Sequence, residues 1–335
     1  MCLKPFFIIN PNANTGKLEK KIDLLLDTIK QHYGEFEYKF TQRVRDEYSI
    51  AQKAIEDGYK LIIAVGGDGT ATNIGDVIVN NPDVKLGLIS AGTACDWHRT
   101  HSLLGDFEKG LAIIKEGYSE KFAAIKCTGD KENYAFDMVD GGFTGQAAAA
   151  AHKEFLWIKS PNIQMNLLAV KYLLKFRNTP CTVTIDDKEP LRVEQFTNIF
   201  ASLSDEIISY KVMPGNSYFS QKNNDLGIVL IHGVKRLKRM VLLTRSIKGK
   251  HIGMKGCWLT RGRKVVIESE LKPLCWETEG EIFNEKGMKV TLEYTENAIN
   301  LIVPKDRDYP KQFNESMYSY SYFDSFKKRN IELYS

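Results

Sequence analysis

The chain has 335 residues, of which 43% are hydrophobic and 26% are charged, with 46 Lys and Arg against 42 Asp and Glu. This composition is that of a globular protein with room for two domains, and it excludes an intrinsically disordered chain. No apolar stretch approaches the roughly 20 residues that a membrane-spanning helix needs. We expect no secretory signal, because MCLKPFFIINPN shows no apolar region followed by a small-residue cleavage site.

Short apolar runs alternate with helical patterns over the first third of the chain. We expect strands at residues 6–9, 36–40, 61–65 and 86–89, and helices at residues 18–33, 48–57 and 72–79. Strands and helices that alternate in this way form a parallel sheet with helices on both faces. The sequence therefore predicts an α/β N-terminal domain, a Rossmann-like three-layer fold, over residues 1–122.

Beyond this domain, short alternating runs separated by turn residues predict strands at residues 181–185, 197–203, 227–231, 264–268 and 289–294. One helical pattern, at residues 162–176, interrupts them. We interpret residues 123–304 as a mostly antiparallel β-sandwich domain. Residues 305–335 are rich in aromatic side chains and are expected to pack back on the body, with a disordered tail as the alternative.

The cysteines and the charges bear on location and partners. The six cysteines form no CxxC pair, so reduced thiols in the cytoplasm are expected, and neither a disulfide framework nor a zinc site is. Residues 226–267 contain eleven Lys or Arg and no Asp or Glu, which leaves the rest of the chain acidic. This stretch suits an anionic membrane surface, a nucleic acid or a polyphosphate, or it is the solvated face of a sheet.

Three polar loops follow predicted parallel strands, at the end where open α/β sheets bind ligands. They are NPNANTGK, GGDGT and the loop at residues 90–99. The loop NPNANTGK places Lys17 at a helix start, which suits an anion, although such a loop is often a simple connection. In GGDGT, the glycines allow main-chain N–H groups to reach phosphate oxygens. Asp68 can hold Mg²⁺ or a Mg²⁺-bound water, and Thr70 can bind phosphate or cap the helix.

Two further segments carry candidate site residues. In the loop at residues 90–99, Gly92 is followed by a threonine, while Asp96 and Arg99 can form a simple salt bridge within a helix. In ETEGE, Glu279 and Glu281 flank a glycine, and on an extended segment residues two apart point to the same side. Such carboxylates can act as a base and as an organiser of metal or phosphate, or they belong to an acidic turn.

The order of these segments resembles the diacylglycerol kinase catalytic family, which includes bacterial soluble diacylglycerol kinases and YegS-like lipid kinases, sphingosine kinases and ceramide kinases. The resemblance covers residues 4–304 and rests on IINPNANTGK, AVGGDGT, GTACDWHR and ETEGE. NAD kinases share GGDGT. The first loop and the acid-Gly-Glu segment near residue 280 favour the lipid kinases.

The resemblance implies an NAD-kinase-like and diacylglycerol-kinase-like fold of two domains, with ATP and Mg²⁺ in the cleft between them. It implies that Asp68 holds the metal, and that Glu279 stands where the family has its general base, usually Asp. Asp225 resembles an acidic residue that supports a structural Mg²⁺ in some bacterial members. The residues implied to contact or border the nucleotide are Asn10, Lys17, Thr41, Gly66, Gly67, Gly69, Thr70, Gly92, Thr93 and Glu281.

The sequence also departs from the family pattern. Thr72 and Asn73 stand where the family usually has Asn and Glu, and the lost glutamate is a candidate catalytic or nucleotide contact. Cys95 replaces an asparagine that contacts the nucleotide, and Ser90 replaces a proline. Glu279 in place of Asp keeps a carboxylate but moves it outward by one methylene.

We therefore expect a cytoplasmic, peripherally membrane-associated lipid kinase that uses ATP and Mg²⁺ and transfers the γ-phosphoryl group to a diacylglycerol-like or long-chain-base-like lipid. Residues 143–157 and 162–176 are candidates for an apolar groove, and the acid-free stretch is a candidate for membrane docking. Some relatives form homodimers. No nucleic-acid partner is expected, because base-reading modules are lacking. The alternatives are an NAD kinase and a catalytically impaired relative that binds nucleotide or lipid.

Overall fold

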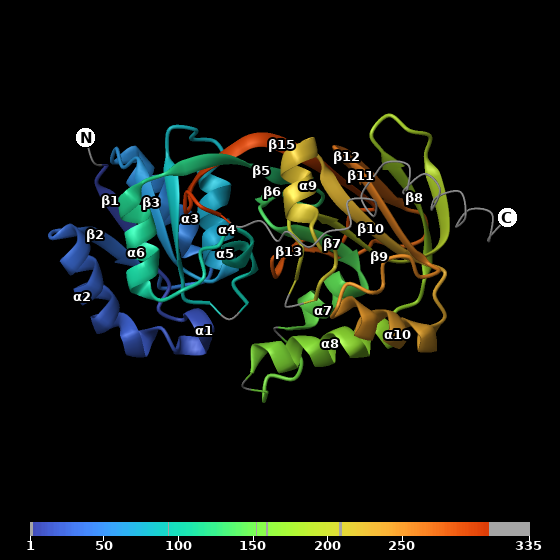
Figure 1. Cartoon of the computed structure of the whole chain (residues 1–335). Helices are drawn as coiled ribbons and strands as arrows, with labels where there is room; N and C mark the ends of the chain where they lie inside the picture. Colours follow the sequence, from blue (N-terminus) through green and yellow to red (C-terminus); the bar gives the residue numbers. More distant parts are fainter. Residues whose placement is uncertain (1–2, 93, 152, 159, 208–209, 308–335) are drawn as a thin grey trace. The chain divides into compact units, whose positions relative to one another are not determined.

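A five-stranded parallel sheet organises the N-terminal part of the chain. The structure, a computed structural model, describes residues 3–307 apart from residues 93, 152, 159 and 208–209 (Figure 1). The sheet runs β15–β4–β3–β1–β2 and contains β1 (Pro5–Ile9), β2 (Glu37–Phe40), β3 (Leu61–Gly66), β4 (Lys85–Ser90) and the carboxyl end of β15 (Lys289–Ile302). Every residue of β1 and β3 is buried, which explains their unbroken apolar runs. The predicted parallel sheet is confirmed.

The chain reverses its direction across this sheet at β1. It passes through α2 (Ile22–Tyr33) to β2 on one side, then returns through α3 (Asp46–Glu56) to β3 and through α4 (Asp68–Ile78) to β4 on the other. Because such crossovers are right-handed, α2 lies on one face and α3 and α4 lie on the opposite face. The carboxyl ends of β1 and β3 therefore flank a topological switch point, the usual ligand site of such sheets.

The remaining helices of this part are short or flank the sheet. α6 (Phe107–Glu116) packs against α2 and β4, and α3 packs against α4. The short segments are α1 (Ala13–Gly16), the 3₁₀ turn at Glu19–Lys21 and α5 (Asp96–Thr100). α4 begins four residues earlier than the predicted helix at residues 72–79, because extended Gly67 is its N-cap. The GGDGT motif therefore contains the first turn of α4.

Antiparallel strands form the second part of the chain. They are β6 (Glu132–Ala135), β7 (Met138–Gly142), β8 (Thr179–Ile185), β9 (Leu191–Ser202), β10 (Leu226–His232), β11 (Cys257–Gly262), β12 (Lys264–Ser269), β13 (Trp276–Thr278) and β14 (Glu281–Asn284), with parts of β5 (Ser119–Thr128) and β15. The order β14–β13–β7–β9–β8–β12–β15 branches at β9, which also pairs with β10. The predicted antiparallel sandwich is confirmed.

β10 shows why this part forms layers. Its residues Ile228 and Leu230 enter one apolar core, whereas Val229 and Ile231 enter a second core on the other side of the strand. This alternation is the period of two that a strand imposes on its side chains. Because both faces are covered, the strand reads as a continuous apolar run.

Four helices accompany these strands: α7 (Phe143–Ala151), α8 (Pro161–Lys175), α9 (Asn216–Asn223) and α10 (Arg236–Ser246). Only α8 matches a predicted helix, within one residue at each end. α7 and α8 pack together through small side chains, with Ala147, Ala150 and Leu168 at their contact. α10 also packs against α8. In the described part of the chain, no helix is long and apolar enough to cross a membrane.

The chain divides into two compact units. Residues 3–124 and 296–307 belong to the first, and residues 125–295 to the second. This division differs from the predicted boundary after residue 304, because the carboxyl end of β15 pairs with β4 of the first unit. The predicted C-terminal segment, residues 305–335, lies outside the described residues from residue 308 onward.

The basic stretch 226–267 does not act as one charged surface. Arg239 is buried on α10, where its guanidinium donates to the carbonyl oxygens of Val234, Leu173 and Phe176. Two of these carbonyls belong to the last turn of α8 and its C-cap, so Arg239 caps that helix. Arg261 is buried as well. The interpretation of the whole stretch as a solvent-facing basic field is therefore wrong for these two residues.

We expect Arg239→Ala to destabilise the second unit by on the order of 3 kcal/mol, because it leaves three buried carbonyl groups without their donor. Arg236→Ala, one turn earlier on the exposed face of α10, is the matched control and should leave stability unchanged. Thermal and urea unfolding of both variants measures the difference. Equal stability of the two variants would contradict the capping role.

Candidate functional site

The first turn of α4 presents backbone donors at the switch point that have no partner within the described part of the chain. Gly67 is the N-cap, with no side-chain cap, and the first helical bond runs from the N–H of Ala71 to the carbonyl of Gly67. The N–H groups of Asp68, Gly69 and Thr70 precede this ladder. Together with the positive end of the helix dipole, they form a site suited to a phosphate group.

The glycines around this turn have different roles. A Cβ atom on Gly92 would lie 2.3 Å from the Cα of Gly67, and a Cβ on Gly66 would lie 2.6 Å from the Thr70 side chain. These positions need glycine because of contacts inside the protein. A Cβ on Gly69 would meet no atom within 4 Å. At Gly69 the missing side chain instead leaves open space beside the helix N-terminus, where a ligand can approach.

Asp68 links the loops that follow β3 and β4. Its Oδ2 accepts from the N–H of Asp96 at 3.0 Å, and its Oδ1 accepts from the N–H of Trp97 at 3.1 Å, so it caps α5. Burial alone would raise the pKa of Asp68, but His98, 3.6 Å away, and the two N–H groups outweigh it and lower that pKa. Asp68 is therefore ionised at neutral pH, as a residue that holds Mg²⁺ must be.

Asn10 holds the loop after β1 against the α4 turn. Its side-chain amide donates to the Thr70 hydroxyl at 3.0 Å, and its side-chain oxygen accepts from the N–H of Asn12. The Thr70 hydroxyl is buried and donates to Glu47, so a phosphate contact from Thr70 falls to its main-chain N–H. Asn10 and Thr70 thus lie in contact, but their side chains hydrogen-bond within the protein and hold the loops in place.

The other predicted residues of the first unit lie at the same edge of the sheet. Thr41 follows β2 and donates its N–H to the carbonyl of Ile9. Lys17 is exposed and follows a loop in which Asn14 and Thr15 have positive φ. Thr93 lies outside the described residues.

The departures at Ser90 and Cys95 are partners of each other. The Ser90 hydroxyl donates to the sulfur of Cys95 at 3.1 Å, and Cys95 is buried. Burial raises the pKa of the Cys95 thiol, which therefore stays neutral. Cys95 thus packs inside the loop, where the resemblance implied an asparagine in contact with nucleotide.

In the second unit, the acid-Gly-Glu segment is a two-residue hairpin turn. Glu279 and Gly280 both have positive φ, and Thr278 pairs with Glu281 across the turn between β13 and β14. Of the two interpretations, the acidic turn is therefore confirmed, and Glu279 and Glu281 do not share a strand face. The Oε1 of Glu279 accepts from the N–H groups of Phe136 and Asp137, at 2.9 and 2.7 Å. Glu281 is half-buried at the start of β14.

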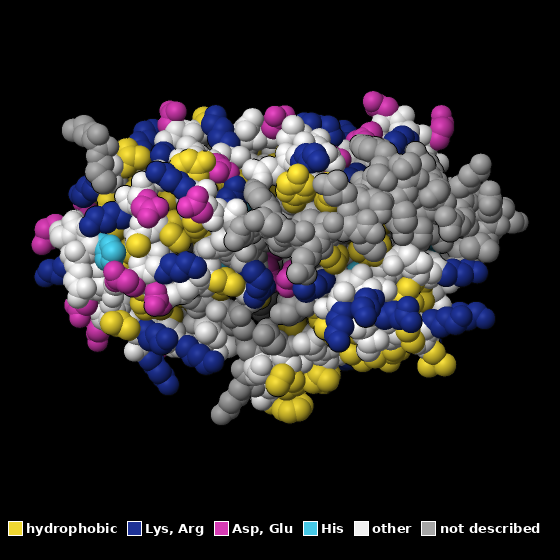
Figure 2. Space-filling model, in the orientation of Figure 1, with side chains coloured by type: hydrophobic (Ala, Val, Ile, Leu, Met, Phe, Trp, Pro, Cys, Tyr) yellow, Lys and Arg dark blue, Asp and Glu magenta, His cyan; other side chains and the backbone are white. Residues whose placement is uncertain are grey.

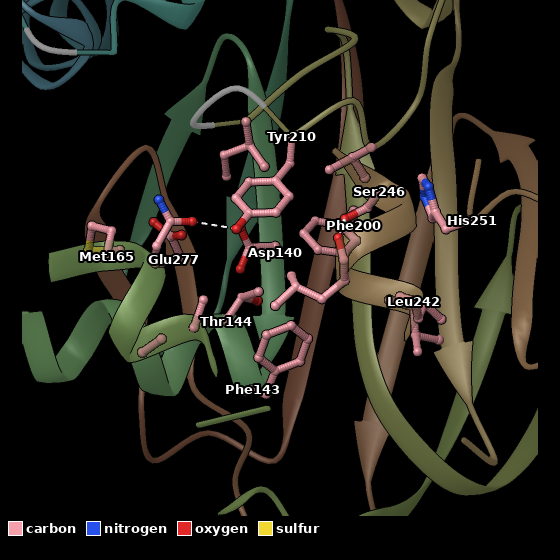
Figure 3. Close-up of a pocket in the computed structure, with 17 residues that line it drawn as sticks. Asp140, Phe143, Thr144, Met165, Phe200, Tyr210, Leu242, Ser246, His251 and Glu277 are labelled. Carbon is pink, nitrogen blue, oxygen red and sulfur yellow. Dashed lines mark hydrogen bonds between the residues drawn. The ribbon is translucent and has the colours of Figure 1, made fainter. Parts of the chain in front are cut away.

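An apolar cavity lies within the second unit (Figure 3). Most of its lining is apolar and comes from α7, α8, α10 and strands β9 and β10, and both predicted groove segments contribute. The side chains that line it include Phe143, Ala147, Met165, Ala169, Phe200, Ile231, Leu242 and Leu243. Its lining, mostly apolar with a few polar groups, is typical of a small-molecule pocket.

Two carboxyl groups lie on this cavity, and the sequence analysis missed both. Asp140 on β7 and Glu277 on β13 are cross-strand neighbours. Burial, and then the charge of Glu277, raise the pKa of Asp140 well above its usual range, and burial also raises that of Glu277. Burial and the neighbouring charge therefore disfavour ionisation of both carboxyl groups at once. The Oδ1 of Asp140 is buried and has no hydrogen-bond partner among the described residues. The available signal was an acidic residue inside each of two apolar strands.

Asp225 does not fit the metal ion that the resemblance implied. Its Oδ1 accepts from two nitrogens of Arg261, at 2.8 and 2.6 Å, and both side chains are buried. The guanidinium also donates to the Asn216 side-chain oxygen and to the Ser220 hydroxyl. The described residues contain no cluster of three His, Cys, Asp or Glu that could hold a metal. A guanidinium therefore supplies the positive charge beside Oδ1 of Asp225, while Oδ2 is buried without a hydrogen-bond partner among the described residues.

Comparisons with known proteins agree with this architecture. The model of the diacylglycerol kinase catalytic domain matches residues 4–127, and that of the YegS C-terminal NAD kinase beta sandwich-like domain matches residues 137–303. Diacylglycerol kinases of Staphylococcus aureus strains RF122 and MRSA252 are each 27% identical over 195 residues, 58% of this chain. The match spans 57% of the length of these relatives.

Solved structures share the fold. The crystal structure of a Bacillus anthracis diacylglycerol kinase has a TM-score of 0.63 and 14% identity, and the match covers 90% of this chain and 97% of that one. Yeast NADH kinase in complex with NADH has a TM-score of 0.50 and 9% identity, with 97% and 89% covered. At these identities the likeness shows the fold alone.

We expect Arg261→Met to destabilise the second unit by about 3–5 kcal/mol, because it leaves the Asp225 carboxylate buried without its cation. The double variant Asp225→Leu/Arg261→Met should recover much of this loss, since it removes both charges. In the absence of nucleotide, EDTA should leave the melting temperature of the wild-type chain unchanged. A fall in melting temperature that Mg²⁺ reverses would contradict the assignment of Arg261 as the resident cation.

Proposed function

Because the chain belongs to the diacylglycerol kinase catalytic-domain family, we propose that it is a lipid kinase that transfers the γ-phosphoryl group of ATP to a lipid hydroxyl. The observation that carries the lipid acceptor is the apolar cavity with a carboxyl pair, in the same chain as the GGDGT turn. A cavity lined by aliphatic and aromatic side chains does not complement the polar surface of a dinucleotide acceptor such as NAD.

The first unit supplies the phosphate donor site. The N–H groups at the start of α4 bind phosphate oxygens, and Gly69 leaves room for them. Exposed Lys17, on the loop after β1, adds a positive charge. The ionised Asp68 carboxylate keeps lone pairs beyond those that accept from Asp96 and Trp97. It would hold Mg²⁺ through a bound water, and the ion would neutralise charge on the triphosphate.

The second unit supplies the acceptor. Figure 3 shows Asp140 and Glu277 beside the Tyr210 ring, with Phe143 and Leu242 further along the cavity. The apolar walls bury acyl chain, and the unpaired Oδ1 of Asp140 accepts a hydrogen bond from a polar group of the lipid. Glu279, held by two main-chain donors, accepts the proton of the hydroxyl that attacks phosphorus.

The decisive test is transfer of labelled phosphate from ATP with Mg²⁺ to a panel of lipids in mixed micelles, with NAD as a soluble acceptor. We expect label on one lipid class and none on NAD. Asp68→Asn should lower turnover at least about a hundredfold, since it removes the carboxylate charge at the phosphate site. Its melting temperature must be measured alongside, because Asp68 also caps α5.

Two outcomes would contradict the proposal. Label on NAD alone would make the chain a soluble-acceptor kinase. Full turnover by Asp68→Asn would exclude Asp68 from the phosphate site. Asp57→Asn, an exposed carboxylate on the same unit, is the matched control and should keep wild-type turnover.

A membrane-facing surface accompanies the lipid cavity. α8 and α10 line the cavity with one face, and on the outside they and the preceding loop expose large apolar side chains, with Trp157 79% and Leu237 85% exposed. The others are Leu156, Ile163, Leu167, Leu174, Val241 and Ile247. Exposed Lys235, Arg236, Lys238 and Arg245 surround the α10 members. Figure 2 shows this combination of apolar and basic side chains over α8 and α10.

This surface has the composition of an interfacial membrane contact, in which apolar and aromatic side chains enter the headgroup region and cations bind anionic lipid. The basic stretch 226–267 contributes through α10, whereas its buried arginines serve the fold. The partner of this surface is therefore an anionic bilayer, from which the acceptor lipid reaches the cavity.

We expect Trp157→Ser/Leu237→Ser to lose most binding to vesicles that contain phosphatidylglycerol, measured by co-flotation. Leu271→Ser, an equally exposed leucine in the loop after β12, is the matched control and should bind like the wild type. Neutral phosphatidylcholine vesicles should bind weakly. Binding to duplex DNA in preference to the anionic vesicles would contradict the membrane assignment.

A further inference from the structure

Glu47, near the start of α3, buries a carboxylate against α4. The residue is 4% exposed. Its Oε1 accepts from the Thr70 hydroxyl at 3.3 Å, and its Oε2 accepts from the Asn73 side-chain amide at 3.4 Å. Thr70 and Asn73 are three residues apart, so they lie on the same face of α4. One carboxylate therefore bridges two positions of the helix that begins with the GGDGT turn.

This contact extends to the loop after β1. A threonine hydroxyl has a single proton, and in Thr70 it goes to Glu47, so the Thr70 oxygen is an acceptor toward the Asn10 amide. The side-chain oxygen of Asn10 in turn accepts from the N–H of Asn12. The carboxylate thus fixes the donor role of the Thr70 hydroxyl in the chain of hydrogen bonds that runs from α3, through α4, to the loop at residues 10–17.

Stability alone does not explain a carboxylate in this place. Burial raises the pKa of Glu47, and both of its hydrogen bonds to α4 are long. Among the ion pairs of the described residues, none involves Glu47. A buried acid without a cation is unfavourable compared with a neutral side chain of the same size. Such groups are found where function requires them.

We propose that Glu47 supplies from α3 the carboxylate that the family pattern places on α4, at the position of Asn73, and that it is a positioning residue for the nucleotide. The proposal rests on the proposed kinase function. Glu47 orients the Thr70 hydroxyl, and Thr70 in turn aligns the first turn of α4 and the Asn10 loop. In this interpretation the carboxylate stands on α3, at position 47, and its amide partner stands on α4, at position 73, where the family pattern has the carboxylate.

A reciprocal exchange tests this assignment on the full-length chain. The variants are Glu47→Gln, Asn73→Glu and the double variant Glu47→Gln/Asn73→Glu, with Glu56→Gln on the exposed face of α3 as the matched control. The measurements are the dissociation constant for ATP with Mg²⁺ by calorimetry, kcat and KM for ATP, and the melting temperature. Calorimetry needs no acceptor lipid, so its result is separate from the identity of the substrate.

We expect Glu47→Gln to weaken ATP binding by about tenfold or more and to raise KM more than it lowers kcat, since one amide cannot accept from both donors. Asn73→Glu alone should be at least as impaired, because two carboxylates then face each other. The double variant should recover most of the affinity, because a carboxylate again accepts from Thr70. Glu56→Gln should match the wild type.

Distinct results would overturn distinct claims. If Glu47→Gln binds ATP like the wild type, or if the double variant is no better than the single ones at equal melting temperature, Glu47 is not a positioning residue. If the wild-type chain binds no ATP, both this proposal and the proposed function fail. If it binds ATP but phosphorylates no acceptor, only the proposed function fails, and the affinities of the variants still decide the role of Glu47.

Discussion

The contact between the backbones of Gly67 and Gly92 is the constraint on which the first unit depends. Only residues without a Cβ allow the loops after β3 and β4 to come this close. The contact brings Asp68 against the N-terminus of α5, where two main-chain donors hold its carboxylate. It also leaves the N-terminus of α4 free of any side-chain cap. Asp68 therefore lies in the first turn of α4 and also caps α5. The N-terminus of α4, with the positive end of its helix dipole, stays open.

The departures from the family pattern occur together with structural partners. Ser90 and Cys95 contact each other, and Asn73 contacts Glu47. Asp225 keeps its carboxylate but pairs with Arg261. Taken one at a time along the sequence, these residues suggest lost contacts. In three dimensions each of them contacts a second side chain, while the Oδ2 of Asp225 is buried without a hydrogen-bond partner among the described residues. The departures therefore do not by themselves indicate a damaged protein.

The sequence predicted the parallel sheet because β1 and β3 are buried on both faces and read as apolar runs. It located the GGDGT turn but placed the start of α4 too late, since an extended glycine cap leaves no mark in helical periodicity. α7 and α10 were missed because an alanine run and a basic run lack a clear polar and apolar alternation.

The site of the second unit was predictable only in part. Glu279 and Glu281 were recognised as candidate site residues. The positive φ of Glu279, which makes the hairpin turn, could not be predicted because glutamate rarely adopts that conformation. Asp140 and Glu277 become a pair only through the register of β7 and β13. The contacts of Glu47 likewise depend on the packing of α3 against α4. Long-range pairings of this kind have no local pattern in the sequence.

Arg261 changes what a magnesium titration of this protein reports. A structural site that bound a divalent ion would compete with a triphosphate for the metal in solution. Folding and turnover would then both respond to the metal concentration. A guanidinium is part of the polypeptide, is present at a fixed stoichiometry and cannot dissociate. With a guanidinium beside Asp225, we expect the stability of the second unit to be independent of the supply of divalent metal.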